Sequence, residues 1–208
     1  MKDKLKELFE SNKNNFSVFK EQANRQNVSS IWGMGVIPPY SILPFYSEIL
    51  GNKPGKFLKK NSFPGKNKQH YILNSKNEII NSIEYSEYSE FNKQWIVYNK
   101  FYFHSSESII EYSFGSALEN DTNVNLDSIK LAQLENGIIV RGGVLRETDE
   151  YEYEYEELEY ESKDGNINFI KHKNWWANVY FERAYSIIYN DNISIYEISD
   201  KGNTKIFP

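Results

Sequence analysis

Hydrophobic and polar positions alternate along most of the chain after residue 70, and this alternation predicts β-strands. Successive side chains of a strand point to opposite faces, so a period of two places apolar residues on one face and polar residues on the other. Short polar turns separate the alternating runs. Two of them, Asn136-Gly137 and Asp164-Gly165, carry the residues that favour a type I′ hairpin turn. The pattern therefore predicts nine to eleven strands joined by hairpins over residues 71–207.

Sequential hairpins build an antiparallel meander, and a sheet of about ten strands must twist, curl or close. Gly142-Gly143 inside a predicted strand, and Glu156-Glu157, which breaks the alternation, are natural sites for a bulge or a bend. The sequence predicts one mainly β (α+β) domain over residues 1–208. It is a large, curved antiparallel meander sheet with a short N-terminal helical region packed on it.

A helical pattern occupies residues 1–25. Its apolar residues recur at spacings near three and four: Leu5, Leu8, Phe9, Phe16 and Phe19. Weak helix formers at 11–15 interrupt it, so two short helices or one frayed helix fit. Residues 26–70 are rich in Gly and Pro and predict an irregular segment with Trp32 as a packing anchor. We expect both regions to cover the concave or apolar face of the sheet.

Aromatic residues make up 16% of the chain, so the core is expected to be aromatic. Trp95 shares an alternating face with Val97 and Phe101, which predicts that Trp95 is buried. One of Trp175 and Trp176, which are neighbours on one strand, is predicted to be buried as well.

Tyr and Glu alternate in one acidic stretch, which predicts a strand with tyrosines packed on one face and glutamates in water on the other. Like charges in a row repel one another and create a strong negative potential, which suits a basic protein partner. The predicted partner-binding residues are Glu150, Tyr151, Glu152, Tyr153, Glu154, Tyr155 and Glu156. The alternative is a solvated face whose charge is neutralised by Lys and Arg on neighbouring strands.

Composition and charge limit the function further. The chain has no Cys, which excludes disulfides, thiolate catalysis and Cys-ligated zinc. No stretch approaches the ~20 apolar residues of a membrane helix, and the N-terminus lacks the apolar core of a signal peptide, so we expect a cytoplasmic protein without a membrane partner. Residues 1–70 hold 12 basic and 5 acidic residues, whereas residues 71–208 hold 12 basic and 24 acidic ones. This split is typical either of a partner-facing side or of two solvated surfaces.

No motif for catalysis stands out. His70, His104 and His172 lack a metal-binding spacing, and neither a Gly-x-Ser-x-Gly element nor a phosphate-binding loop is present. Paired carboxylates are too numerous to single out a glycosidase pair. We therefore predict no catalytic residue, no cofactor and no metal. The two Pro-Gly-Lys turns, at 54–56 and 64–66, lie beside Phe57 and Phe63, but two turns on an acidic protein make nucleic acid an unexpected partner.

In general character the chain resembles the immunity proteins of bacterial polymorphic toxin systems. The resemblance covers the hairpin series, residues 53–60 leading to His70-Tyr71-Ile72, and the acidic stretch from Glu150 to Tyr160. It implies a non-enzymatic inhibitor of a cognate toxin and no particular fold. Two alternatives remain open: a curved sheet that holds an apolar small molecule on an aromatic concave face, and a hydrolase that uses Asp or Glu.

Overall fold

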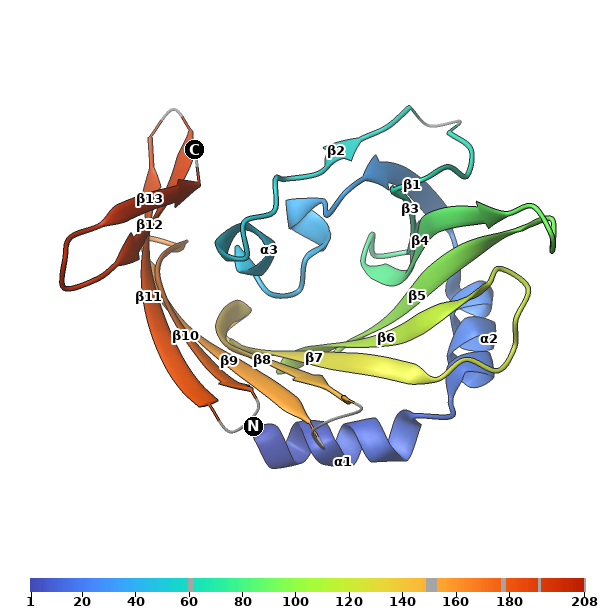
Figure 1. Cartoon of the computed structure of the whole chain (residues 1–208), viewed down its shortest axis with the longest axis horizontal. Helices are drawn as coiled ribbons and strands as arrows, with labels where there is room; N and C mark the ends of the chain where they lie inside the picture. The colour runs from blue at the N-terminus through green and yellow to red at the C-terminus, as the bar shows by residue number, and fades with distance from the viewer. Residues whose placement is uncertain (60–61, 149–152, 177–178, 191, 208) are drawn as a thin grey trace.

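The computed structural model describes residues 1–208 apart from 60–61, 149–152, 177–178, 191 and 208. Its elements, shown in Figure 1, are α1 (Lys2–Asn12), α2 (Phe16–Gln26), β1 (Ser29–Met34), the 3-10 helix η1 (Pro38–Tyr40), α3 (Tyr46–Ile49), β2 (Lys56–Phe57), β3 (Lys68–Leu73), β4 (Ile79–Ser89), β5 (Gln94–His104), β6 (Ser108–Leu118), β7 (Leu126–Glu135), β8 (Ile138–Arg146), β9 (Glu154–Lys163), β10 (Asn166–Trp176), β11 (Val179–Tyr189), β12 (Ile193–Ile198) and β13 (Thr204–Phe207).

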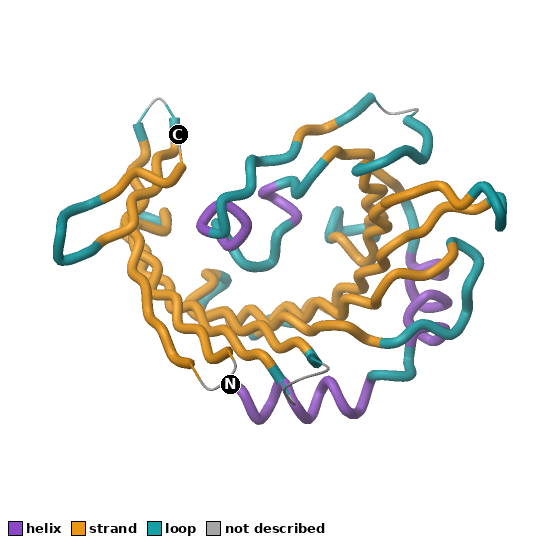
Figure 2. The backbone as a smooth tube through the Cα atoms, in the orientation of Figure 1, coloured by secondary structure: helices purple, strands orange, loops and turns teal. Residues whose placement is uncertain are grey.

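The described strands form one antiparallel sheet of thirteen strands. From β3 to β13, each strand pairs with the next strand in the chain. β1 breaks this order, because it pairs with both β2 and β3 and lies between them. The sheet stays open, with β2 and β13 as its edges. Figures 1 and 2 show the sheet bent into a deep trough, which gives it a concave and a convex face. The predicted curved meander is confirmed.

Each face of the trough has its own cover (Figure 1). The two helices α1 and α2, which match the predicted pair, pack on the convex face, where Leu5 and Phe9 are buried against Leu145 and Tyr155 of the sheet. Residues 37–49 run inside the trough, where Leu43 and Tyr46 join the concave core. We expected both regions on one face. The two regions cover opposite faces because the strands present apolar residues on both faces of the sheet.

The hairpin turns form as their residues predict. Asn136 and Gly137 have φ values of 52° and 79°, and Asp164 and Gly165 have φ values of 52° and 80°. These left-handed backbone angles are the ones a type I′ turn requires. The two turns join β7 to β8 and β9 to β10.

Neither predicted bulge site in β8 or β9 is a bulge. The pairing of β9 with β8 and β10 is regular through Glu156 and Glu157. Gly142 and Gly143 pair regularly with β7 and serve instead as points of close approach. A Cβ on Gly142 would lie 2.5 Å from Leu43 on the concave side, and one on Gly143 would lie 2.8 Å from Leu5 on the convex side. The two glycines let both covering layers reach the backbone of β8.

Three expectations about local structure and burial are wrong. Neither Trp175, which is half-buried, nor Trp176, which is 53% exposed, is a buried core residue. Residues 29–34, expected to be irregular, form β1 and pair along their whole length with β3. Trp95 is only half-buried, because it lies at the end of β5 beside the turn, where it contacts Tyr85 and Tyr88 edge-on. Trp32 is buried, as its predicted anchoring role requires.

Candidate functional site

The acidic stretch enters the sheet as β9, in the middle of the trough (Figure 1). Glu150, Tyr151 and Glu152 lie outside the described residues. Tyr153 packs on α1: its ring lies 5.8 Å from the ring of Phe9, and its hydroxyl donates a hydrogen bond to Glu10. Tyr155 is buried in the convex core. The expected packing of the tyrosines is thus confirmed for Tyr155.

Glu156 contradicts the expectation of a water-exposed glutamate face, because only 3% of it is exposed. It points into the trough, where α3 covers it. Its Oε1 accepts hydrogen bonds from the Tyr46 hydroxyl and from Arg146 Nη1, each at 2.7 Å. Nε2 of His172 lies 2.7 Å from Oε2 of Glu156. Arg146 belongs to β8 and His172 to β10, so the flanking strands supply a neutralising cation and a hydrogen-bonding ring.

The pKa of Glu156 records this environment. Burial by itself would raise it, but the hydrogen bonds from His172 and Tyr46 and the positive charge of Arg146 outweigh burial and lower the pKa to about 2. Burial raises the pKa of the Tyr46 phenol, which therefore stays protonated and donates to the carboxylate. Glu156 is an ionised, internally paired group that ties α3, through Tyr46, to the floor of the trough.

A second buried ion pair continues the polar floor toward β6 and β7. Lys130 Nζ lies 2.7 Å from Glu111 Oε1, and Ser113 Oγ donates a hydrogen bond to the same carboxylate at 3.0 Å. The ammonium of Lys130 also lies 5.9 Å from the centre of the Tyr46 ring. The concave face is therefore polar along this line, and residues 37–49 of the chain itself cover the apolar core beside it.

The other two histidines are part of the packing. His70 stacks on Trp32, with ring centres 4.3 Å apart and planes 8° apart. His104 Nε2 lies 2.7 Å from the carbonyl oxygen of Ile79. Across the described part of the chain, no group of three or more His, Asp or Glu residues could hold a metal ion.

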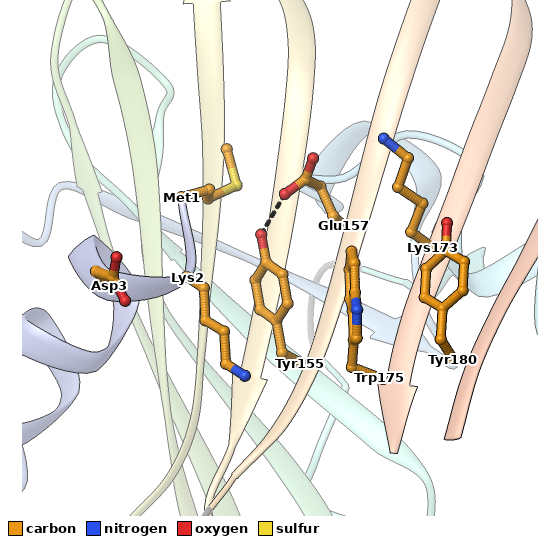
Figure 3. A pocket seen from close by; sticks show the side chains of 8 residues that line it. All are labelled: Met1, Lys2, Asp3, Tyr155, Glu157, Lys173, Trp175 and Tyr180. Carbon is orange, nitrogen blue, oxygen red and sulfur yellow. Dashed lines mark hydrogen bonds between the residues drawn. The ribbon is translucent and has the colours of Figure 1, made fainter. Parts of the chain in front are cut away.

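The convex face carries a row of three aromatic rings where the cover by α1 ends (Figure 3). Tyr155 on β9 stacks on Trp175 on β10 at 5.1 Å and 28°, and Trp175 contacts Tyr180 on β11 at 5.1 Å and 42°. Tyr155 and Trp175 are directly opposite each other in the pairing of β9 with β10, as are Trp175 and Tyr180 in the next pair of strands. Regular strand pairing thus builds the aromatic row, whose exposure increases from the buried Tyr155 to the half-exposed Tyr180.

The aromatic row lines an open cavity of about 470 Å³ between the first turn of α1 and the sheet. Figure 3 shows its lining residues: Met1, Lys2, Asp3, Tyr155, Glu157, Lys173, Trp175 and Tyr180. The Tyr155 hydroxyl and Arg141 both donate hydrogen bonds to Glu157, and these outweigh burial and lower the pKa of its carboxyl group. Lys173 pairs with Glu159 at 2.6 Å. The glutamates here are matched by cations of the neighbouring strands, as the alternative interpretation of the acidic stretch expects.

Of the residues that line the cavity, only Tyr155 is among the predicted partner-binding residues. The sequence does not reveal the cavity, because the proximity of its residues depends on the register of three strands and on where α1 begins. One signal was present: Trp175 and Tyr180 flank a short hairpin connection, so they must lie close to each other across it. An open, aromatic and charged cavity of this kind can hold a side chain of another molecule.

Comparison of the chain with protein-family models, curated proteins and solved structures found no match. Among the helices that the structure describes, none is both long and apolar enough to cross a membrane.

Proposed function

We propose that this protein is a non-enzymatic cytoplasmic binding protein that holds a basic protein partner at the aromatic row, and that it neutralises a toxin as an immunity protein does. The observation that carries the proposal is the aromatic row itself: Trp175 and Tyr180 stand half-exposed over an open cavity, supported from below by the buried Tyr155. Aromatic anchors at the centre of an interface supply most of its binding free energy.

Net charge favours a basic partner. Residues 153–198, which contain β9 to β12, hold nine acidic and four basic residues. Because Glu156, Glu157 and Glu159 are already paired within the sheet, the net charge would mainly raise the association rate, and the aromatic rings would supply the affinity. The association rate should therefore fall between low and physiological salt.

The test is to co-express the chain with the protein encoded by the neighbouring gene and to measure complex formation and growth. Replacing Tyr180 by Ala removes a half-exposed ring and should weaken the complex by roughly 30-fold or more, the loss expected for an interface anchor. Trp175→Ala should weaken it further.

Trp176→Ala is the matched control. Trp176 is the next residue of β10, and 53% of it is exposed, but it points to the opposite face of the sheet. The control should leave the affinity unchanged. Equal losses for Trp175→Ala and Trp176→Ala, or a complex that tolerates Tyr180→Ala, would remove the aromatic row from the interface. A neighbouring protein that is not toxic would remove the immunity role.

A further inference from the structure

A second surface with the opposite charge lies at the far edge of the sheet, around β2 (Figure 1). We call it the basic edge and define it by Lys53, Lys56, Lys59, Lys66, Phe57 and Phe63. β2 pairs with β1, and on either side of it Gly55 and Leu58 donate backbone hydrogen bonds to Val36 and Trp32, at 2.6 Å and 2.8 Å. The segment is thus fixed to the sheet in an extended conformation.

The charge of this edge differs from that of the rest of the chain. Residues 49–77 contain seven Lys and no Asp, Glu or Arg, whereas the other residues hold 17 basic and 29 acidic ones. The four lysines of the basic edge are exposed. The carboxylate of Glu84, on the nearby strand β4, lies 3.6 Å from Lys100. A local charge of this sign suits an anionic partner.

Two phenylalanines are exposed among these lysines: Phe57 by 56% and Phe63 by 76%. Lysines and prolines commonly protect an edge strand from pairing with other chains, but exposed phenylalanine rings do the reverse. Phe57 is steadied by an edge-on contact with the ring of Tyr40 at 6.1 Å. The rings are therefore available to a planar partner.

We propose that the basic edge binds single-stranded nucleic acid. Lys56 lies in the edge strand β2, and Lys53 and Lys59 lie three residues before and after it. All three are exposed, so their flexible side chains can contact a phosphate backbone laid along the edge. Phe57 and Phe63 provide faces on which unpaired bases stack. In a duplex the bases are already stacked on each other, so the rings favour a single strand. The basic edge is less suited to binding a membrane, because its apolar part consists of a few side chains and does not form a continuous amphipathic face.

The test is a titration of fluorescein-labelled oligothymidylate of about 16 nucleotides with the full chain, followed by fluorescence anisotropy. Raising the salt from about 50 mM to about 200 mM should weaken binding by roughly 20-fold if three phosphates are contacted. Replacing Lys53, Lys56 and Lys59 by Gln should lower the affinity at low salt at least tenfold and flatten the salt dependence. Replacing Phe57 and Phe63 by Ala should lower the affinity at least tenfold and leave the salt dependence unchanged.

Each variant has a matched control. Lys163→Gln, Lys201→Gln and Lys205→Gln together remove three exposed lysines that lie away from the basic edge, on β9, on the β12–β13 connection and on β13. Phe91→Ala removes a ring that is 95% exposed on the β4–β5 turn. Both controls should bind like the unaltered chain.

Four results would overturn the proposal. The first is that the chain does not bind the oligonucleotide at low salt, and the second is that the variants and their controls lose equal affinity for it. The third is that a duplex of the same length binds with equal affinity. The fourth is that the chain self-associates and the triple lysine variant abolishes this self-association. Binding to phosphatidylglycerol vesicles in place of the oligonucleotide would identify the edge as a membrane contact and would equally reject it. None of these results bears on the aromatic row, whose variants leave the basic edge intact.

Discussion

Glu156 and Glu161 lie on the same strand, yet they meet different surroundings. Glu156 is buried under α3 and paired with Arg146 and His172, whereas Glu161 is exposed. The pKa of Glu156 in the folded protein is about 2, below the ordinary value of 4.5. A carboxyl group with a depressed pKa stabilises the fold above its unfolded-state pKa, and this stabilisation is lost as the pH falls through the folded-state value.

We therefore expect Glu156 to contribute on the order of 3 kcal/mol to stability above about pH 5, lost progressively toward pH 2. The Glu156→Gln variant should be less stable than the unaltered chain at pH 7, and the difference should shrink as the pH falls. Urea unfolding at a series of pH values measures it. Glu161→Gln, the exposed control, should follow the unaltered chain throughout. A difference between the Glu156 variant and the unaltered chain that does not change with pH would contradict the pairing seen here.

At the scale of single elements, β8 shows how two layers use one strand. Gly142 faces Leu43 in the trough and Gly143 faces Leu5 of α1, so the strand has no side chain where the layers come closest. Glycine weakens a strand interior, but here it makes room for close approach from both sides.

A methyl group on Gly142 would overlap with the end of the Leu43 side chain. We expect Gly142→Ala to destabilise the protein by about 1–3 kcal/mol, the usual effect of overpacking. Gly115→Ala is the control, because the nearest atom to a Cβ there is the Asn125 carbonyl oxygen at 3.8 Å. Chemical denaturation should place the control within about 0.5 kcal/mol of the unaltered chain. Equal stability of the two variants would mean that the concave layer packs less closely than described.

At the scale of the whole molecule, one open sheet keeps two cores and two charged regions apart. The convex core joins the helices to β5–β9, and the concave core joins residues 37–49 to the trough. The acidic strands β9–β12 lie in the half of the sheet that ends at β13, and the basic edge at β2 lies at the opposite edge. The two proposed binding surfaces can thus act without sharing residues.

Because α1 closes the convex core, we expect Phe9→Ala to cost about 3–5 kcal/mol, as for other fully buried phenylalanines. Phe91→Ala, the same change at an exposed ring, should alter stability by less than about 0.5 kcal/mol. Urea unfolding of both variants measures the contrast. Comparable stability of the two would place α1 off the sheet in solution.

The sequence by itself determined the features that depend on neighbouring residues. Period-two alternation and the turn residues at Asn136-Gly137 and Asp164-Gly165 determined the hairpin series, because both act over a few residues. The weak helix formers at 11–15 fitted two short helices or one frayed helix, and the structure has two. The strand β1 escaped prediction because its pairing with β3 overrides a Gly- and Pro-flanked sequence.

The tertiary structure alone decided which face of the sheet each layer covers and which glutamates reach water. Glu156 is buried because Tyr46, 110 residues earlier in the chain, sits over it and donates to it. The aromatic row exists because three strands align Tyr155, Trp175 and Tyr180 side by side. Alternation along a strand separates two faces but does not say what covers either one, since the cover comes from segments distant in the chain.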